Sequence, residues 1–380
     1  MNIFYLITRA DQGGAQTKVL ALAKAGLERG HQVRIGTGES GWLTERAKEA
    51  GIPVVVFRHL QRTWNPLAVG SFLRELKKEI VQHPIDILHL HSSNTLFGAL
   101  LRGRLGVASP KIIATVCGLS IMNPGWTGNR LKKMLFNLVT AKLWARCDWI
   151  IFVCHWDREF AVRQGFVRAA VSSVVYNGLP ENVPYLSRTE ARRRLDIDMF
   201  GQEFVVGTVA RLDYQKGLDL FIDLADVMRH ENIKFRIVGT GADLMALEQR
   251  IADLGLRDQV TILTESKDAF RFMPAFDVFV LTSRYEGLPW TLLEAQQARV
   301  PMVSVDVAGC SEIVLRNQTG WLIADRRPEA LAAAIREVRE RPDLAVRLTE
   351  NAYRRGRTVF AEAALTDGNY SIYNKLLSDA

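Results

Sequence analysis

The chain of 380 residues has few cysteines and no long apolar run. Its four cysteines form no C-x-x-C pair, so the sequence predicts neither a zinc site nor a disulfide framework. The longest apolar stretches, such as residues 149–154, fall far short of the roughly 20 residues that a bilayer span requires. Residues 1–8 lack a basic leader and a cleavage site and are typical of a first strand, so we expect a cytoplasmic protein.

The composition is that of a soluble globular protein. Hydrophobic residues make up 48% and charged residues 24% of the chain, with 28 glycines and 12 prolines. These values exclude a disordered or collagen-like chain. At roughly 100 to 200 residues per domain, the length predicts two domains.

Both halves repeat one pattern, a short β-branched run followed by a turn and an amphipathic helix. Strands that alternate with helices predict parallel sheets covered on both faces. Helices are expected at 15–29 and 218–228. The expected strands are 3–8, 32–37, 54–57, 86–91, 111–116, 149–153 and 172–176 in the first half, and 204–210, 234–238, 260–263, 278–281 and 302–305 in the second.

The pattern predicts an α/β protein of two doubly wound, Rossmann-like domains that face a central cleft. The polar, Arg-rich stretch 184–201 is the expected linker, so we place the domains at 1–184 and 185–359. Residues 360–380 add a helix that we expect to pack back on the first domain. Ligands of such sheets bind at the carboxyl ends of the strands, where site residues should be sought.

The most informative segment is Leu-Thr-Ser-Arg-Tyr-Glu-Gly-Leu-Pro-Trp-Thr-Leu-Leu-Glu-Ala at 281–295. It predicts a buried strand, a glycine turn and a helix with Pro289 at its first position. Amides near Gly287 and Leu288 would favour an anion such as a diphosphate. Glu286 in the loop and Glu294 in the second helical turn flank that anion site, and Glu294 could accept hydrogen bonds from vicinal sugar hydroxyls. The alternative is two solvated acids.

A second constellation follows the strand 204–210. Arg211 comes directly after it, and Lys216 stands before the next helix. Two fixed cations at a strand end can neutralise a diphosphate leaving group without a metal. The alternative is surface charges that pair with neighbours such as Asp213.

Glycine turns recur at the same expected edge. Gly13 and Gly14 precede the first helix, and Gly239 and Gly241 follow the strand 234–238. Such turns let backbone amides approach a phosphate, base or ribose closely. No G-x-G-x-x-G is present, which argues against a dinucleotide oxidoreductase.

In these motifs, their order and their spacing, the sequence resembles the retaining family 4 glycosyltransferases of the GT-B fold, whose E-x7-E motif corresponds to Glu286 and Glu294. The resemblance implies a retaining, metal-independent hexosyltransferase that uses a nucleotide sugar, with UDP as the family's usual nucleotide, and needs no cofactor. It implies that Arg211 and Lys216 hold the donor diphosphate. Glu286, Gly287 and Leu288 would contact the donor sugar and phosphate, Glu294 the ribose, and Gly14 the phosphate from the other domain.

One departure from the family stands after the fifth expected strand. The family often has T-x-H-G there, with a histidine that touches the donor sugar, whereas this chain has Cys117 before Gly118. A thiol is a weak hydrogen-bond partner. His89 and His91 end the fourth expected strand, and His91 is a candidate contact of donor or acceptor, although a structural role is at least as expected for each histidine.

The positive charge belongs to the first half. Residues 1–184 carry 23 Lys and Arg against 12 Asp and Glu. Residues 129–146 form an expected basic amphipathic helix, in which Arg130, Lys132 and Lys133 could face an anionic membrane surface. We therefore expect the first domain to bind a glycan or polyprenyl-linked acceptor in surface polysaccharide assembly, at the inner face of the membrane. An ordinary half-buried helix is the alternative.

Other function classes fit less well. A sugar-nucleotide epimerase of the same fold is the main rival, which E-x7-E disfavours, and no lysine context suggests the pyridoxal site of a phosphorylase. A nucleic-acid-binding protein would explain the basic half, but no binding module is present, so no nucleic acid is expected. Asp196 and residue 198 spell D-x-D within the expected linker, away from any strand end, and no metal site is predicted.

Overall fold

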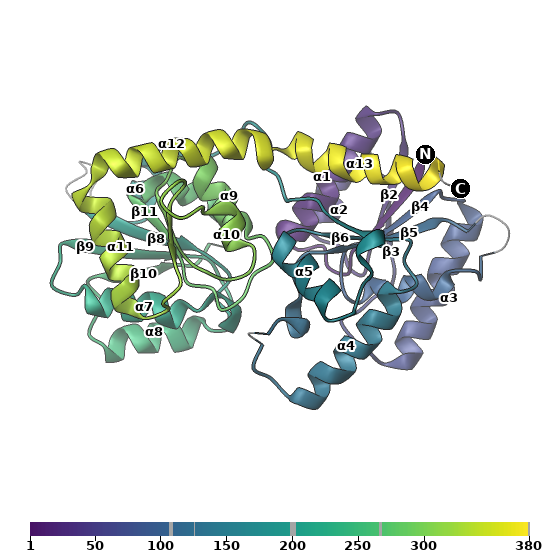
Figure 1. Cartoon of the computed structure of the whole chain (residues 1–380), viewed down its shortest axis with the longest axis horizontal. Helices are drawn as coiled ribbons and strands as arrows, with labels where there is room; N and C mark the ends of the chain where they lie inside the picture. The colour runs from purple at the N-terminus through teal and green to yellow at the C-terminus, as the bar shows by residue number, and fades with distance from the viewer. Residues whose placement is uncertain (106–108, 125, 198–202, 266–267, 379–380) are drawn as a thin grey trace. The chain divides into compact units, whose positions relative to one another are not determined.

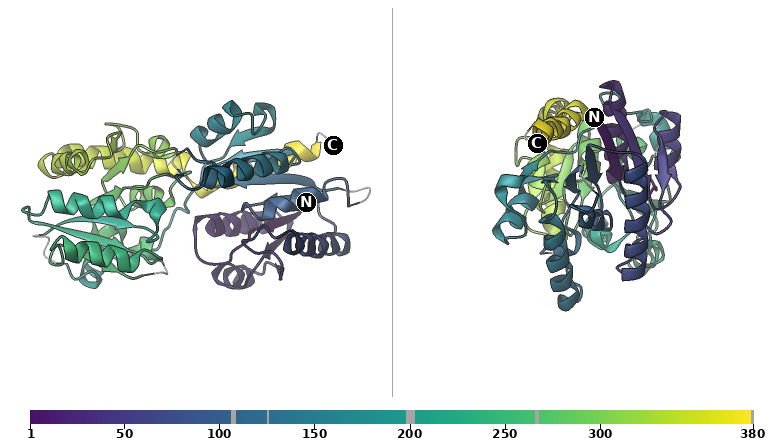
Figure 2. Two further views of the ribbon diagram at one scale, coloured as in Figure 1. Left: turned by 90° about the horizontal axis from the view of Figure 1, so that it is seen from below. Right: turned by 90° about the vertical axis from the view of Figure 1, so that its right-hand side faces the viewer.

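The computed structural model describes residues 1–105, 109–124, 126–197, 203–265 and 268–378. It divides the chain into two compact units, one of Met1–Asn177 with Glu362–Ala380 and one of Gly178–Ala361. Each unit is a parallel sheet with helices on both faces (Figures 1 and 2). Both units therefore have the doubly wound α/β architecture that the strand and helix pattern predicts.

The first unit holds a sheet of seven strands in the order β3-β2-β1-β4-β5-β6-β7, and every pairing is parallel. The strand order reverses between β1 and β4. Its strands are β1 Asn2–Leu6, β2 Gln32–Thr37, β3 Val54–Val56, β4 Ile87–Leu90, β5 Lys111–Val116, β6 Trp149–Phe152 and β7 Ser172–Val174. Its helices are α1 Gly14–Glu28, α2 Trp42–Glu49, α3 Pro66–Gln82, α4 Arg130–Trp144, α5 His155–Arg163 and α13 Glu362–Ser378, with short 3-10 turns at Thr95–Leu101, Ser120–Met122 and Ala169–Val171.

Successive residues of the strands enter two different cores. Phe4 and Leu6 pack with α3 and α4 on one face, whereas Ile3 and Tyr5 pack with α1, α2 and α13 on the other. Because side chains alternate along a strand, a central strand between two helical layers must be apolar throughout. This explains why the buried strands are continuous apolar runs.

The last helix, α13, belongs to the first unit. Its Tyr370 hydroxyl donates to the Leu22 carbonyl oxygen of α1 at 3.0 Å, and Tyr373 lies 2.6 Å from His89 Nδ1. Tyr370 and Tyr373 are both buried. The final helix thus forms part of the core beside β1 and α1.

The second unit holds six strands in the order β10-β9-β8-β11-β12-β13, again all parallel. The carboxyl ends of β8 and β11 are neighbours in this order. The strands are β8 Phe204–Val209, β9 Ile233–Val238, β10 Val260–Leu263, β11 Val278–Leu281, β12 Met302–Val305 and β13 Trp321–Ile323. The helices are α6 Arg188–Arg194, α7 Leu218–Val227, α8 Leu244–Asp253, α9 Trp290–Gln297, α10 Cys310–Ile313, α11 Pro328–Glu340 and α12 Pro342–Val359, with 3-10 turns at Tyr214–Lys216 and Ala269–Ala275.

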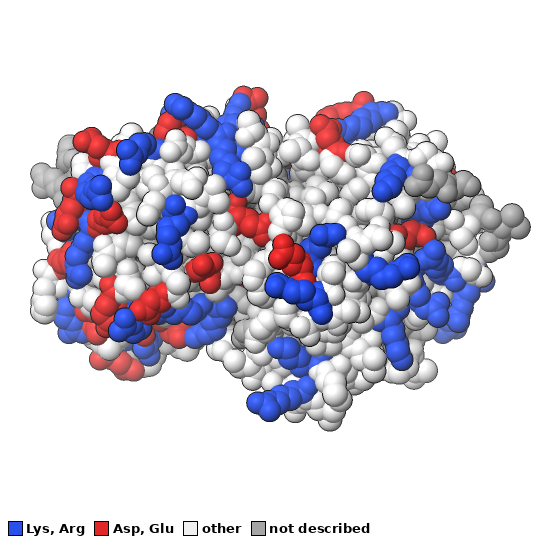
Figure 3. Space-filling view, in the orientation of Figure 1, with Lys and Arg blue, Asp and Glu red and all other residues white. Residues whose placement is uncertain are grey.

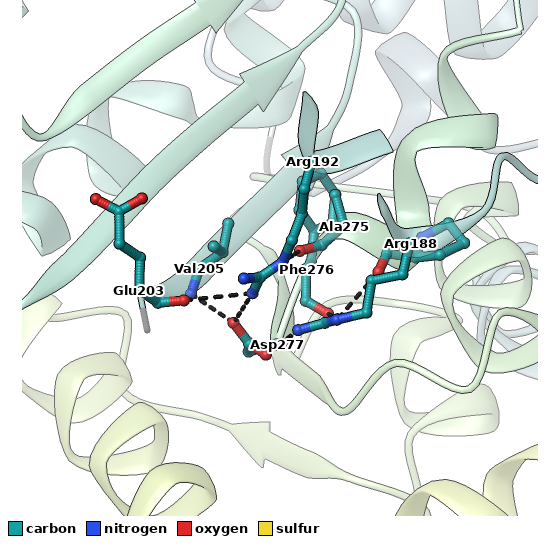
Figure 4. A network of polar contacts seen from close by, with 8 residues as sticks. Arg188, Arg192, Glu203, Val205, Ala275, Phe276 and Asp277 are labelled. Atoms are coloured by element: carbon teal, nitrogen blue, oxygen red, sulfur yellow. Dashed lines mark hydrogen bonds and ion pairs between the residues drawn. The ribbon is translucent and has the colours of Figure 1, made fainter. Parts of the chain in front are cut away.

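The expected linker at 184–201 is wrong for its described part. Residues 188–194 form α6, and Arg192 is 1% exposed. Its guanidinium lies 2.7 Å from Asp277 Oδ2, and Arg188 pairs with Asp277 Oδ1 at 2.5 Å (Figure 4). A carboxylate just before β11 therefore ties this Arg-rich segment to the second unit and holds Arg192 inside it.

The unit boundary falls between Asn177 and Gly178, seven residues before the expected one. The intervening segment is tied to the second unit, since Gln297 Nε2 donates to the carbonyl oxygens of Pro180 and Glu181 at 2.7 and 2.8 Å. The Leu179 amide likewise donates to the Phe360 carbonyl oxygen at 2.9 Å. Hydrogen bonds to backbone carbonyl oxygens do not depend on the side chain of the accepting residue, so the sequence pattern does not predict this boundary.

Candidate functional site

The candidate site of the second unit is built where β8 and β11 end. Glu286, in the loop after β11, is 7% exposed. Its Oε1 lies 2.6 Å from Lys216 Nζ and accepts a hydrogen bond from Ser283 Oγ at 2.6 Å. Gln215 Nε2 donates to the other carboxylate oxygen at 3.4 Å and to the Tyr285 carbonyl oxygen at 3.0 Å. A buried carboxylate with a cation and two polar donors is satisfied.

Gly217 brings the two loops together. It has φ +61°, and a Cβ at this position would lie 2.4 Å from the Thr282 carbonyl oxygen. Thr282 in turn donates through Oγ1 to the Lys216 carbonyl oxygen at 3.1 Å. Since only glycine tolerates both the left-handed backbone and this close approach, the Lys-Gly pair that the sequence singles out fixes the position of the Lys216 ammonium.

Helix α9 begins one residue later than expected. Pro289 is its N-cap, with extended backbone, and Trp290 is the first helical residue. The Gly287 carbonyl oxygen accepts from the Gly309 amide at 3.0 Å, and Leu288 is 3% exposed. The turn is therefore anchored in the core. It connects Glu286, which pairs with Lys216, to the first amides of α9, and such unpaired amides favour an anion.

Glu294 lies in the second turn of α9 and is half-buried. Removal from water raises the pKa of its carboxyl to about 7, and the nearby Lys216 charge lowers it in part. Tyr185 packs against this turn and donates to the Glu294 carbonyl oxygen at 2.8 Å. A carboxyl that is partly protonated near neutral pH and has no salt bridge to any of the described residues is available to a hydroxyl-bearing ligand.

Arg211 differs from Lys216 in exposure. Its side chain is 67% exposed and pairs with Asp213 at 3.1 Å, as the alternative interpretation had it. It also donates to Gln215 Oε1 at 3.4 Å, so Gln215 links Arg211 to Glu286. Gln215 and Ser283 are site residues that the sequence reasoning missed, although both lie within segments that it singled out.

The structure explains Gly239 and Gly241 by packing. A Cβ would lie 1.9 Å from the Ala210 carbonyl oxygen at Gly239 and 2.2 Å from the Leu212 carbonyl oxygen at Gly241. The Gly239 amide already donates to the Leu263 carbonyl oxygen at 2.9 Å. Glycine is needed at both positions because the backbone that follows β8 passes too close for a side chain. That the amides of Gly239 and Gly241 contact a ligand stays a prediction.

In the first unit, Gly13 and Gly14 open helix α1. Gly13 is the N-cap, in extended conformation, and its carbonyl oxygen accepts from the Thr17 amide at 2.9 Å. Gln16 folds back on the turn, and its Nε2 donates to the Arg9 carbonyl oxygen at 3.2 Å and to Asp11 Oδ1 at 3.1 Å. The turn thus presents the start of a long helix, as expected for a phosphate contact.

The histidines of the first unit differ sharply. His89 is fully buried, with Nδ1 2.6 Å from the Tyr373 hydroxyl and Nε2 2.7 Å from Thr115 Oγ1, which is a structural role. His91 is 2% exposed, and neither ring nitrogen has a hydrogen-bond partner among the residues described. Cys117 is exposed. The sequence reasoning missed Lys18, a fully buried lysine of α1 whose signal is its place on an apolar helix face.

Helix α4 exposes an apolar stripe. Its core side carries Phe136, Leu143 and Trp144. Figure 3 shows Lys and Arg side chains beside uncharged surface over α4. Lys133 donates to the Asn123 carbonyl oxygen at 2.7 Å, whereas Arg130 and Lys132 are exposed. The exposed apolar side chains are Leu131 (68%), Met134 (63%), Leu135 (52%) and Leu138 (53%).

Within the described ranges, no three His, Cys, Asp or Glu side chains lie close enough together to hold a metal ion. Residue 198 of the D-x-D spelling lies outside these ranges. None of the described helices is both long and apolar enough to cross a bilayer.

Comparison with known proteins finds a family for each half. Residues 12–182 match the family described as Glycosyltransferase Family 4, and residues 188–355 match Glycosyl transferases group 1. Together the matches take in most of both units and contain all the candidate site residues of the second.

Several curated relatives are named for lipopolysaccharide or O-antigen biosynthesis. The chain is 28% identical over 261 residues to the UDP-Gal:alpha-D-GlcNAc-diphosphoundecaprenol alpha-1,3-galactosyltransferase of Escherichia coli, covering 67% of the chain and 65% of the relative. It is 26% identical over 317 residues to the O-antigen biosynthesis glycosyltransferase WbnH of Escherichia coli, covering 83% and 84%. The chain spans about half to two thirds of the length of the first curated relatives that it matches.

A solved structure shares the whole fold. Anabaena HepE, crystallised in complex with UDP-glucose, superposes with a TM-score of 0.84 at 22% identity, over 100% of both chains. The fold is that of the GT-B glycosyltransferases, two parallel sheets in separate Rossmann-like units, as the sequence predicts.

Proposed function

We propose that this chain, which belongs to the glycosyltransferases of family 4 and group 1, moves a hexosyl unit from a UDP-sugar to a glycan or polyprenyl-linked acceptor with retention of configuration and without a metal. The family and the polysaccharide-assembly relatives support the reaction class. The UDP-glucose complex of HepE supports the donor, and the name of the Escherichia coli relative supports a lipid diphosphate acceptor.

The observation that carries the proposal is the Lys216–Glu286 pair at the start of α9. Lys216 Nζ lies 2.6 Å from Glu286 Oε1, and its side chain is only 14% exposed. A nearly buried ammonium beside the amino end of a helix is preorganised for a diphosphate, because the protein has already removed most of the water around it. Gly217 holds this ammonium in place from the backbone.

The remaining roles follow from position. Arg211 adds an exposed cation for the diphosphate, and Gln215 connects it to Glu286 through hydrogen bonds to both residues. Glu286, with Gly287 and Leu288, is placed to contact the donor sugar and phosphate. Glu294, one helical turn beyond the amino end of α9, is the proposed ribose partner. In the first unit, Gly14 remains the proposed contact for a phosphate.

The proposed chemistry breaks the bond between the anomeric carbon and the diphosphate oxygen, forms a bond from that carbon to the acceptor oxygen, and passes the acceptor proton to the departing diphosphate. The leaving group is the base, so no further general base is required. Lys216 and Arg211 stabilise the charge that develops on the diphosphate. Glu286 is already bonded to Lys216 and Ser283, which fits an orienting role.

Calorimetric titration with UDP tests the assignment. Lys216→Met should weaken UDP binding by about tenfold to a hundredfold, because a charge-assisted hydrogen bond is lost. Arg211→Met should weaken it less, since Arg211 is exposed and its interaction is screened. Lys234→Met, at the far end of β9, is the control. Equal UDP affinity in the Lys216 variant and the wild type would show that the pocket is misplaced.

We further propose that α4 docks the first unit on an anionic bilayer, where a polyprenyl-linked acceptor resides. Its four exposed apolar side chains follow helical spacing on one stripe, and exposed Arg130 and Lys132 flank them. Between residues 101 and 150 eight Lys and Arg face a single acid, Asp148. Apolar burial together with about 1 kcal/mol per basic residue gives reversible binding to an anionic surface.

Vesicle flotation tests this docking. Wild-type protein should float with vesicles that contain phosphatidylglycerol and stay behind with neutral ones. Leu138→Glu on the stripe should abolish flotation, whereas Val346→Glu, an exposed apolar position of α12 in the second unit, should not. Flotation that ignores lipid charge and the Leu138 change would refute the docking.

A further inference from the structure

In the first unit, a lysine and a histidine are buried without the partners that such groups normally have. Lys18 is 0% exposed, and no atom of the described residues lies within hydrogen-bond distance of its Nζ. His91 is 2% exposed, and among the described residues neither of its ring nitrogens has a hydrogen-bond partner. Buried polar groups are almost always hydrogen-bonded, so two orphans together point to an absent ligand.

The two groups act on each other and on a thiol. Burial, and after it the Lys18 charge, lowers the pKa of His91 well below its ordinary value. Lys18 also lies close enough to Cys117 to interact electrostatically with its thiol. Burial lowers the pKa of Lys18 to about 8. No carboxylate of the described residues forms a hydrogen bond with the Lys18 ammonium. The neighbouring His89 cannot serve as a ligand contact, because Tyr373 and Thr115 occupy both of its nitrogens.

The position in the fold is that of a ligand site. Lys18 stands on α1, which follows β1, His91 directly follows β4, and Cys117 directly follows β5. These three strands are neighbours, and the strand order reverses between β1 and β4. In doubly wound sheets the crevice outside the carboxyl ends at such a reversal is where ligands bind. Cys117 is exposed, so a reagent in solution can reach its thiol.

We propose that Lys18, His91 and Cys117 form a subsite for an oxyanion carried by a sugar, either a carboxylate or a phosphate. The positive Lys18 ammonium would pair with the negative oxyanion. The neutral His91 ring offers one hydrogen-bond donor and one acceptor to a hydroxyl next to the anion. The substrate class is then an acidic or phosphorylated sugar rather than a neutral one. This subsite rests on the proposed glycosyltransferase function and adds a specificity to it.

Labelling of Cys117 in the wild-type chain tests the subsite. Cys117 is the exposed cysteine, while Cys147, Cys154 and Cys310 are buried, so iodoacetamide should modify it selectively. Saturating glucuronate or glucose 6-phosphate should slow this modification about tenfold, because the bound fraction is shielded. Glucose and inorganic phosphate, each lacking half of the proposed ligand, should leave the rate unchanged.

A matched pair of variants identifies the cation. Lys18→Met should remove the protection by both sugar anions, whereas Lys24→Met, an exposed position on the same helix, should keep it. A thermal shift with UDP, recorded on the same samples, reports on the second unit, so a loss of UDP binding and a loss of sugar-anion protection are separate results. Should Lys18→Met not fold, the wild-type labelling decides alone.

The labelling outcomes are mutually exclusive. Protection by both sugar anions supports an oxyanion subsite that takes either group, protection by glucuronate alone assigns a carboxylate, and protection by glucose 6-phosphate alone assigns a phosphate. Equal protection by glucose, protection by inorganic phosphate as strong as that by the sugar anions, or no protection by any probe would overturn the subsite. Protection that survives Lys18→Met would overturn the role of the buried ammonium.

Discussion

Glu294→Gln should make the unliganded protein more stable at alkaline pH. Burial raises the pKa of the Glu294 carboxyl from its ordinary 4.5 to about 7. Between these two values the folded state binds more protons than the unfolded state, so stability falls as pH rises from 4.5 to 7 and stays low above it. Glutamine cannot ionise, and the variant escapes this loss.

The magnitude follows from the two pKa values. Each pKa unit is worth about 1.4 kcal/mol, so ionised Glu294 destabilises the second unit by about 3 kcal/mol above pH 7. At about 2 to 4 °C per kcal/mol for a domain of this size, the variant should melt roughly 6 to 12 °C higher at pH 8. At pH 4.5 the two proteins should melt nearly together, since Glu294 is then protonated in the folded wild type.

Differential scanning calorimetry at several pH values between 4.5 and 8 provides the measurement. Glu248→Gln, at an exposed position of α8, is the matched control and should leave the pH profile unchanged. Parallel profiles for the Glu294 variant and the wild type would refute the reasoning, because the carboxyl would then ionise in the folded protein as it does in the unfolded chain.

The same residue ties stability to ligand binding. If the Glu294 carboxylate accepts hydrogen bonds from ribose hydroxyls, only its ionised form binds well, and UDP affinity should fall as pH drops below 7. The fall should approach tenfold per pH unit in the wild type and vanish in Glu294→Gln, whose affinity is low throughout. A more stable protein that binds its ligand worse is the pattern expected of a functional carboxyl.

Two further changes test the framework of the second unit. Gly217→Ala should destabilise it by about 1 to 3 kcal/mol in urea unfolding and weaken UDP binding, because of the left-handed backbone and the 2.4 Å approach to the Thr282 carbonyl oxygen; unchanged stability would contradict the strained turn. Asp277→Asn should cost about 3 to 5 kcal/mol in the same measurement, because it removes the carboxylate that pairs with the buried Arg192 guanidinium at 2.7 Å, with Asp325→Asn at an exposed loop as its control. A loss no larger than that of the control would show that the Arg192 pair is not needed.

The sequence predicts most of the fold because the strands are buried on both faces. Continuous apolar runs placed twelve of the strands, five of them with the bounds that the structure gives, such as Lys111–Val116 and Met302–Val305. The edge strand Trp321–Ile323 was missed, since a strand of three residues forms too short a run to stand out. The helix Arg188–Arg194 was missed because its arginines pair with Asp277, a partner 85 residues away from Arg192.

The site was predictable where local backbone requirements select the residue. Lys216 and Gly217 stand out because a left-handed glycine must follow the lysine, and Glu286 stands out because it precedes a turn and a helix. The partners Gln215 and Ser283 carry no such requirement. Lys18 was missed although it lies on the apolar face of its helix, because a lysine within a helix is normally exposed and its burial is seen only in the packed structure.

A crystal structure of the chain with a UDP-sugar tests the central claim most directly. The account predicts the diphosphate within hydrogen-bond distance of Lys216 Nζ and of the first amides of α9, with the ribose hydroxyls on Glu294. A diphosphate bound elsewhere in the second unit, or one held through a metal ion with the Lys216–Glu286 pair intact and remote from it, would contradict the account.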